Sequence, residues 1–192
     1  MKLAELPPSS FLKRLFDIGA ELSGIYRFSA LGKGNLIAIS ARVKSPSRLI
    51  LGRSVTIQQG SILHCGGKAW SGYRGYIRLG DGVKIGPYCV IYGAGGIELE
   101  DYVHLGPGVK LMSQAGKHDA KRLTTNPNHL LDAIQIGEGS WIGTNAVVLG
   151  GTQIGRCVTV SPNSVVSGVI PDYAVIVGNP CRIVFKNEAL NQ

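Results

Sequence analysis

The chain has 192 residues, of which 44% are hydrophobic and 17% charged, with 27 glycines and a formal net charge of +8. This composition is typical of a globular domain with its own core and excludes an intrinsically disordered chain. The sequence has no apolar run long enough for a membrane-spanning helix and no apolar segment of the kind found in signal peptides. We therefore expect one cytoplasmic domain over residues 1–192.

The four cysteines, Cys65, Cys89, Cys157 and Cys181, are far apart and form no C-x-x-C pair. This spacing predicts neither a disulfide framework nor a bound metal. Residues 1–60 hold nine Lys or Arg against three Asp or Glu. Two interpretations stay open: a solvated basic face, or an anionic partner such as a membrane surface or a polyphosphate ligand. The chain has no recognised nucleic-acid-binding motif, so we expect no nucleic acid partner.

Residues 1–48 precede the regular part of the sequence and are predicted to form an N-terminal cap. Within them, residues 9–22 place apolar side chains near helical spacing, and Ser9 or Ser10 could be the N-cap. We expect this short helix to cover the first coil of the fold described next. Peripheral contact with a membrane surface is the alternative.

A six-residue pattern runs through most of the remaining chain. In each copy an aliphatic residue is followed by a small or acidic residue, two free positions and a small or β-branched residue. Copies start at Leu51, Leu79, Ile85, Leu99, Leu105, Ile136, Ile142, Ile154 and Val160, with weaker copies at Ile57, Ile91 and Val148. A period of six does not fit a helical face and instead suits a short strand followed by a corner. Three such faces close a triangular coil, and coils must stack because one coil cannot bury its own apolar edge.

The repeat therefore predicts an all-β fold, a parallel β-helix of five coils over residues 49–169. The aliphatic residues point inward, and the small fifth residue of each copy lies beside them. We interpret Cys89 and Cys157 as small core residues at inward positions. The pattern does not give the handedness, although the general rule for parallel crossovers favours a right-handed one.

Two interruptions of the repeat are candidates for function. Leu63 and Leu79 are 16 positions apart, ten more than one repeat, and the interruption over residues 64–76 includes Trp70, Tyr73 and Arg74. Leu111 and Ile136 are 25 positions apart, nineteen more than one repeat, which predicts an excursion loop over 112–134. Loops of this length inside a compact repeat are usually functional or disordered. The pattern ends before Ile170, so residues 170–192 are predicted to form a C-terminal cap.

Several motifs, taken in their order along the chain, resemble those of the hexapeptide-repeat acyltransferases. They are Lys117-His118-Asp119 in the excursion, Trp141-Ile-Gly-Thr144, Val160-Ser161, Ile170-Pro171 and Gly178-Asn-Pro-Cys-Arg182. The maltose or galactoside and colanic-acid-type sugar O-acetyltransferases are the most similar members. The resemblance implies a left-handed β-helix, a homotrimer with active sites between subunits, acetyl-CoA as donor and a sugar or glycan hydroxyl as acceptor.

Moving an acetyl group from a thioester to a hydroxyl requires removal of the hydroxyl proton, and a neutral imidazole suits this task. The resemblance places His118 in this role. Asp119 is expected to shape the loop or orient the imidazole, and His104, which precedes inward Leu105 at a coil corner, is a further candidate for the acceptor site. The aromatic and basic residues Trp70, Tyr73 and Arg74 could also contact the acceptor.

The resemblance assigns the coenzyme to one group of residues. Backbone and small side chains would hold the pantetheine arm, Trp141 would frame the site and cations would hold the phosphates. The expected coenzyme residues are Trp141, Gly143, Thr144, Ser161, Ser167, Arg182 and Lys186.

The sequence departs from the family pattern in two places. Gly168 stands where many members have a lysine, and there is no Asn between Asn35 and Asn126 to serve as the middle-coil asparagine of the enzymes for small sugars. These departures leave the acceptor open. The alternatives are N-acetylation of an amino-sugar nucleotide, a non-catalytic scaffold, and a carbonic-anhydrase-like zinc site, for which no closely spaced His pair exists.

Overall fold

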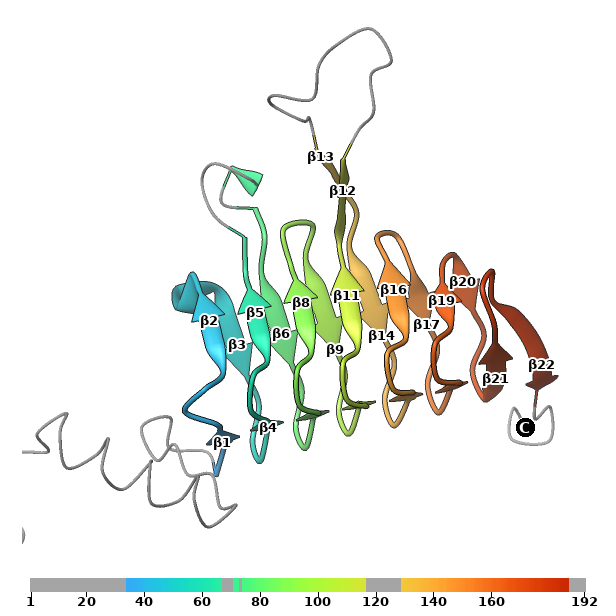
Figure 1. Ribbon diagram of the computed structural model, residues 1–192, viewed down its shortest axis with the longest axis horizontal. Coiled ribbons are helices and arrows are strands. Elements are labelled where there is room, and N and C mark those ends of the chain that lie inside the picture. Colours follow the sequence, from blue (N-terminus) through green and yellow to red (C-terminus); the bar gives the residue numbers. More distant parts are fainter. Residues whose placement is uncertain (1–33, 67–70, 73, 117–128, 187–192) are drawn as a thin grey trace, which may run out of the picture.

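A computed structural model describes residues 34–66, 71–72, 74–116 and 129–186 (Figure 1). The described strands form three parallel sheets that are the sides of a triangular prism, and the coils stack along its long axis. The fold is a left-handed parallel β-helix, which confirms the predicted fold class. The expected helix over residues 9–22 lies outside the described residues.

Sheet A forms the first side of the prism. Its outward positions are polar or aromatic along most of the stack, and its inward positions are aliphatic. In spatial order it contains β1 (Leu36–Ile37), β4 (Thr56–Ile57), β7 (Lys84–Ile85), β10 (His104–Leu105), β15 (Trp141–Ile142), β18 (Thr159–Val160), β21 (Ala174–Val177) and the antiparallel β22 (Arg182–Lys186).

Sheet B forms the second side, and the chain enters it from sheet A in every coil. It contains β2 (Arg42–Lys44), β5 (Ile62–His64), β8 (Val90–Tyr92), β11 (Lys110–Met112), β16 (Val147–Leu149) and β19 (Val165–Val166).

Sheet C forms the third side. It contains β3 (Leu49–Leu51), β6 (Ile77–Leu79), β9 (Ile97–Leu99), β14 (Ile134–Ile136), β17 (Gln153–Ile154) and β20 (Val169–Ile170), and a 3-10 turn over Pro46–Arg48 leads into β3. An antiparallel hairpin of β12 (Gln114–Gly116) and β13 (His129–Leu131) projects from the prism.

The described stack has six coils, one more than expected, and it begins at Leu36 instead of residue 49. Strand β1 pairs with β4 and strand β2 with β5, so residues 36–44 belong to the β-helix and not to a cap. Ile37 and Val43 are six positions apart, as the repeat requires. The 3-10 turn that follows interrupts the period, which is why the first coil is hard to identify.

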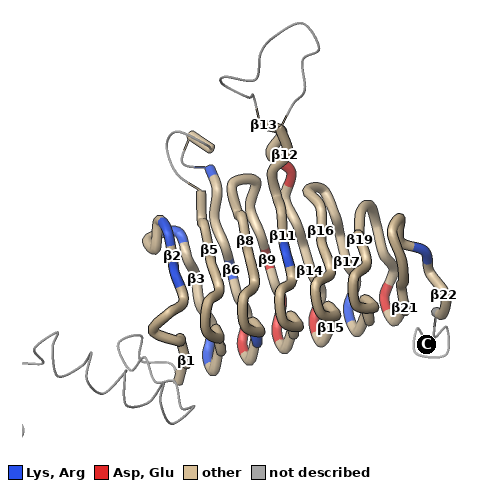
Figure 2. Tube along the Cα trace, in the orientation of Figure 1, with Lys and Arg blue, Asp and Glu red and all other residues tan. Residues whose placement is uncertain are grey.

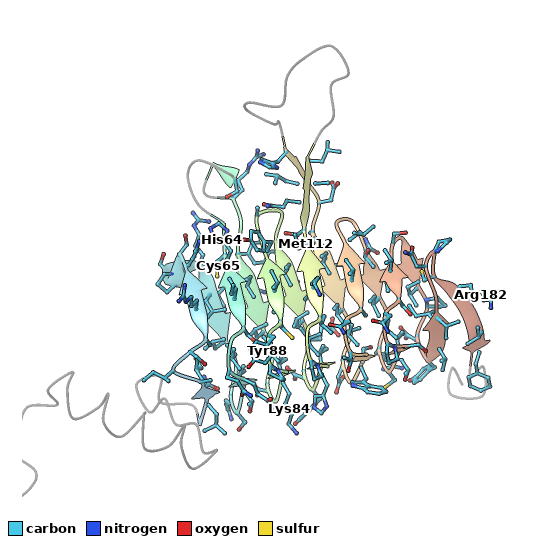
Figure 3. All side chains as sticks on the ribbon, in the orientation of Figure 1. His64, Cys65, Lys84, Tyr88, Met112 and Arg182 are labelled. Carbon is cyan, nitrogen blue, oxygen red and sulfur yellow. The ribbon has the colours of Figure 1, made fainter. Side chains whose placement is uncertain are left out.

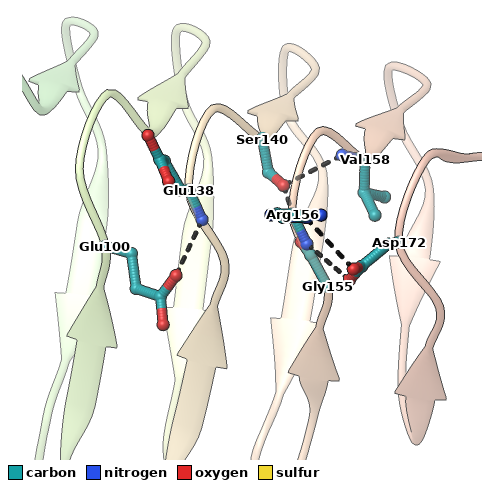
Figure 4. Close-up of polar contacts among 7 residues, drawn as sticks. All are labelled: Glu100, Glu138, Ser140, Gly155, Arg156, Val158 and Asp172. Atoms are coloured by element: carbon teal, nitrogen blue, oxygen red, sulfur yellow. Dashed lines mark hydrogen bonds and ion pairs between the residues drawn. The ribbon is translucent and has the colours of Figure 1, made fainter. Parts of the chain in front are cut away.

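The core is a ladder of the predicted aliphatic residues. Ile57, Ile85 and Ile142 are fully buried, as are their equivalents on the other two sheets. Buried serines at fifth positions connect successive coils: Ser140 Oγ donates to Gly155 O at 2.8 Å and accepts from Val158 N at 3.0 Å (Figure 4). Since the Ser140 hydroxyl both donates and accepts, this serine substitutes for an apolar residue without leaving an unpaired buried atom.

The fourth position of the six-residue repeat, which the sequence pattern leaves open to any residue type, has a restricted backbone conformation. It has a positive φ, with non-glycine examples at Tyr88 (59°), Asn145 (57°) and Cys157 (52°). Cys157 therefore lies on a corner and is exposed, so its prediction as a core residue was wrong, and Val158 is the buried neighbour. Cys89 is buried as predicted, and burial raises the pKa of its thiol to about 11.

The corners between sheets C and A form what we call the acidic edge, shown in part in Figure 4. Here carboxylates of one coil accept hydrogen bonds from backbone N–H groups of the neighbouring coil. Asp81 accepts from Arg53 N at 2.7 Å, and Asp101 accepts from Asp81 N at 2.7 Å. Asp172 accepts from Arg156 N at 2.9 Å. Figure 2 shows acidic residues along this edge of the prism.

Candidate functional site

Both long interruptions leave the prism at the corners between sheets B and C, which we call the loop edge (Figure 1). Residues 65–76 connect β5 to β6, and residues 113–133 connect β11 to β14. The predicted excursion is confirmed, with the β12–β13 hairpin at its base. This two-stranded stem projects from the prism (Figure 1).

Close backbone approaches fix the loop edge between the two interruptions. A Cβ on Gly75 would lie 2.6 Å from Gly93 O, and one on Gly95 would lie 2.7 Å from Asp132 N. Only glycine fits such contacts without displacement of the neighbouring backbone. The first segment therefore packs directly against the corner that follows Tyr92, and the returning end of the excursion packs against the same corner.

Hydrogen bonds anchor the start of the excursion to the coil beneath it. Ser113 Oγ donates to Tyr92 O at 2.7 Å and accepts from Gly95 N at 3.0 Å. The two ends of the excursion are joined where Asp132 N donates to Ser113 O at 3.1 Å. On the other interruption, Arg48 Nη1 donates to Gly75 O at 2.9 Å. The base of each segment is therefore rigidly placed.

Four of the predicted site residues lie outside the described part of the chain: His118 and Asp119 in the excursion, and Trp70 and Tyr73 in the first interruption. The structure gives the place where their segments leave the prism but no position for their side chains. Arg74, the remaining candidate of the first interruption, is exposed.

Two predicted residues, His104 and Trp141, are neighbours on the outer face of sheet A. His104 is in register with Lys84 on one side and with Trp141 on the other. His104 belongs to strand β10 and not to a corner, which corrects the expected position. The pKa of His104 is lowered, first by burial and then by the charge of Lys84, so the imidazole is neutral at neutral pH. Trp141 is 49% exposed, and its ring is accessible.

Three predicted coenzyme residues follow Trp141 on the corners between sheets A and B. Gly143 and Thr144 form the corner of one coil and Ser161 that of the next. Gly143 approaches the next coil closely, since a Cβ there would lie 2.7 Å from Pro162 N. The N–H groups of Gly143 and Ser161 donate to Val160 O and Ile176 O of the next turn of the chain. This corner thus presents small residues, with Thr144 exposed, next to an exposed indole.

The other predicted coenzyme residues lie elsewhere. Ser167 is at the loop edge of the last coil, between β19 and β20. Arg182 opens strand β22 and is exposed, and Lys186 is the last residue of that strand. Within one chain, the structure therefore brings together Trp141, Gly143, Thr144 and Ser161, and separates them from the loop edge by the full width of sheet B.

Two aromatic side chains near the excursion were not among the predicted site residues. His64 and Tyr92 are paired in register on the outer face of sheet B, with ring centroids 5.3 Å apart and an interplanar angle of 32°. Each directly follows an inward aliphatic residue, Leu63 and Ile91. The six-residue frame could have placed them on one face, because the same position of successive coils stacks in register.

A groove of about 470 Å³ lies over the outer face of sheet C, lined by residues that include Glu98, Gln153 and Asp172. None of the predicted site residues lines it. Among the described residues, no three His, Cys, Asp or Glu side chains are grouped as metal ligands. In that same part of the chain, no helix has the length and hydropathy needed to cross a membrane.

Comparison with known sequences identifies the repeat. Residues 133–168 match the model of the bacterial transferase hexapeptide repeat. A Mycobacterium tuberculosis protein named as an acetyltransferase is 32% identical over 137 residues, which are 70% of this chain and 45% of that protein. WbbJ of Escherichia coli, named as a lipopolysaccharide biosynthesis O-acetyl transferase, is 50% identical over 54 residues, 28% of each chain. The chain thus spans less than half the length of each of these two relatives.

Solved structures show the same fold at lower identity. A mutant of AntD, an N-acyltransferase from Bacillus cereus in complex with dTDP and coenzyme A, superposes with a TM-score of 0.72 at 20% identity, over 85% of this chain and 91% of that one. The acetyltransferase domain of PglB from Neisseria gonorrhoeae, in complex with acetyl coenzyme A, gives a TM-score of 0.58 at 23% identity, over 90% and 65%. Residues 133–168 thus belong to the bacterial transferase hexapeptide family, the sequence relatives are named as acetyltransferases, and the solved structures show that the chain shares their fold.

Proposed function

We propose that the protein is an acetyltransferase that moves an acetyl group from acetyl-CoA to a hydroxyl of a sugar or surface-polysaccharide precursor. His118 acts as general base, and the acetyl group transfers directly through a tetrahedral intermediate. The observation that carries the proposal is the excursion bearing Lys117-His118-Asp119, which is raised on a hairpin at the loop edge. The 50% identity with a protein named as an O-acetyl transferase supports a hydroxyl acceptor.

The coenzyme is proposed to bind along the corner between sheets A and B. Trp141 offers an exposed ring, and the small residues Gly143, Thr144 and Ser161 lie next to it. Small residues leave room for the pantetheine arm beside the indole, and Arg182 with Lys186 would take the phosphates. Acetyl-CoA supplies the activated thioester, and the protein supplies position, a base and hydrogen-bond donors.

The complete site is proposed to lie between subunits of a homotrimer. The excursion leaves from the loop edge, whereas the group around Trp141, with Gly143, Thr144 and Ser161, occupies the opposite border of sheet B. Since the hairpin points away from its own prism, a neighbouring copy is the natural partner for the group around Trp141 (Figure 1). Each site would then combine His118 of one chain with Trp141 of another.

His118 would accept the proton of the acceptor hydroxyl while the oxygen attacks the thioester carbon. The proton then passes to the departing thiolate, and the imidazole returns to its neutral form. No covalent intermediate with the protein is needed. Asp119 would hold the loop or orient the imidazole, and His104, which is neutral and borders Trp141, would line the coenzyme side of the site.

Acetylation of an amine on a sugar nucleotide is the second candidate. The observation that favours it is the structural likeness to AntD, an N-acyltransferase whose structure was solved with a dTDP-linked amino sugar and coenzyme A. The chemistry differs only in the attacking atom, so the same base and the same coenzyme site would serve.

The test is release of free thiol from acetyl-CoA with a panel of sugars, glycans and nucleotide-sugars bearing either hydroxyl or amino acceptors. We expect His118→Ala to lower kcat by about 10²–10⁴ and to leave acetyl-CoA binding unchanged. The matched control is His129→Ala, a histidine at the base of the same excursion, which should keep activity. Full activity of His118→Ala would overturn the assignment of His118 as the general base. Transfer to amines alone would overturn the proposal that the acceptor group is a hydroxyl.

A further inference from the structure

One column of side chains runs along the outer face of sheet B next to the loop edge. Lys44, His64, Tyr92 and Met112 are in register on strands β2, β5, β8 and β11. Each directly follows a residue whose side chain points inward, so all four point outward. Figure 3 shows His64 and Met112 on the side of the prism from which both interruptions project.

The column has an aromatic centre. The rings of His64 and Tyr92 lie 5.3 Å apart, and both residues are half-buried. The pKa of His64 is lowered, first by burial and then by the charge of Lys44, so the ring is neutral at neutral pH. A neutral aromatic pair on an accessible face is a suitable surface for the apolar side of a sugar ring. The start of the excursion is hydrogen-bonded to Tyr92 O, so this surface adjoins the loop that carries His118.

The end of the column away from the excursion is basic. Arg42 and Lys44 both point outward from β2 and are exposed. Residues 34–80 contain no Asp or Glu, and among the described residues neither cation has an ion-pair partner. Figure 2 shows basic residues on β2, at the opposite end of the stack from β22. Two cations on other parts of the prism do have acidic partners: Arg156 pairs with Asp172 at 3.4 Å, and Arg78 lies 4.0 Å from Glu98.

We propose that this column binds the acceptor, and that the acceptor is a sugar linked to phosphate. The sugar lies against His64 and Tyr92, close to the loop edge, and the phosphates lie on Arg42 and Lys44. Tyr92 and Lys44 are two strand spacings apart, about 10 Å, so a sugar on the first and a diphosphate on the second extend along one face. The inference rests on the proposed function, because it takes the excursion as the source of the catalytic base.

The phosphate has two chemical sources, a nucleoside diphosphate or a polyprenyl diphosphate lipid. Both present the same sugar–diphosphate linkage, which the two cations would recognise as paired charges. The binding experiment therefore uses a UDP-linked hexose, the same hexose on a short polyprenyl diphosphate, and the free hexose. Binding to the full chain is measured by calorimetry without acetyl-CoA, so the result does not depend on turnover.

The decisive variant is Arg42→Gln/Lys44→Gln, and the matched control is Arg53→Gln/Arg78→Gln. The control also removes two positive charges from the same end of the prism, but Arg53 lies on a corner between sheets C and A and Arg78 lies on sheet C. We expect at least one phosphate-linked sugar to bind the unmodified chain, the decisive variant to bind it about tenfold more weakly, and the control to bind it unchanged. The tighter of the two phosphate-linked ligands identifies the source. Equal binding of the free hexose, or no difference between the two variants, would overturn the inference.

A separate titration with acetyl-CoA distinguishes this inference from the proposed function. Acetyl-CoA affinity should be the same in the unmodified chain and in Arg42→Gln/Lys44→Gln. Weaker acetyl-CoA binding in that variant would assign the two cations to the coenzyme phosphates and overturn the acceptor site. If the unmodified chain fails to bind acetyl-CoA, the proposed function fails, while the phosphate-linked sugar titration still decides whether the basic column is an acceptor site.

Discussion

The acidic edge and the loop edge are built from the same repeat but differ in what closes their corners. At the acidic edge, carboxylates such as Asp81, Asp101 and Asp172 accept hydrogen bonds from backbone N–H groups of the neighbouring coil. At the loop edge, glycines and Ser113 form the contacts, and two long segments leave. The comparison shows that the most conspicuous charges of this fold stabilise the stack, whereas the edge with small residues accommodates insertions.

The largest expected effect comes from removal of the excursion. Replacement of residues 117–128 by an Asn-Gly turn, which suits a two-residue hairpin connection, should lower acetyl transfer by 10² or more because His118 is lost. The melting temperature should change little, since the hairpin lies outside the core. Thiol release and thermal unfolding measure the two effects. Retained activity would mean that the loop edge is not the functional one.

The second prediction concerns close packing at the acidic edge. A Cβ on Gly137 would lie 2.6 Å from Arg156 N and from Gly155 C, which are backbone atoms of the next coil. Gly137→Ala should therefore lower the free energy of unfolding by about 2 kcal/mol. Gly116→Ala is the control, because a Cβ there meets nothing within 4 Å. Denaturant unfolding of both variants measures the difference, and equal stability would contradict the tight contact.

The third prediction separates a structural carboxylate from a functional one. Asp101→Ala removes the acceptor for Asp81 N and should cost about 1 kcal/mol of stability, with kcat unchanged. Asp101→Asn keeps an acceptor oxygen and should cost less. The pair of variants is compared by chemical unfolding and by thiol release. Loss of activity in Asp101→Asn, with stability maintained, would give the acidic edge a functional role.

The smallest expected effect is a pH dependence of the free energy of unfolding that comes from His64 on sheet B and His104 on sheet A. The pKa values of His64 and His104 are lowered from 6.5 by burial, with Lys44 and Lys84 as the neighbouring charges. The folded state therefore binds fewer protons than the unfolded state below about pH 6.5, and the free energy of unfolding falls as the pH drops through that range. The double variant His64→Asn/His104→Gln should show a shallower fall between pH 7 and pH 5. Identical slopes would mean that neither imidazole resists protonation in the folded state.

Much of the fold follows from the six-residue period alone. The inward aliphatic residues, the small fifth positions and the excursion were all predicted, because burial repeats at fixed spacing. Cys157 was misplaced because it stands at the fourth position of the copy that starts at Ile154, where φ is positive and the side chain faces solvent. The inward fifth position of that copy is Val158. The first coil was missed because the turn over Pro46–Arg48 interrupts the count before Leu51.

The candidate site was less predictable than the fold. Trp141 and Thr144 could be identified from their motif, and the structure places them next to each other. Their separation from the loop edge could not be predicted, because it depends on which corner each repeat occupies. The pairing of His64 with Tyr92 depends in turn on how the inserted residues between Leu63 and Leu79 are accommodated.

Because the strands of sheet B stack in register, the length of the column changes only by whole coils. Strand β2 and strand β11 are three strand spacings apart, about 14 Å, with β5 and β8 between them. Deletion or duplication of one complete coil would shorten or lengthen this span by about 4.8 Å without turning any outward side chain inward. Such a protein could therefore change the length of its acceptor in fixed steps while its core, its corners and its coenzyme side stay the same.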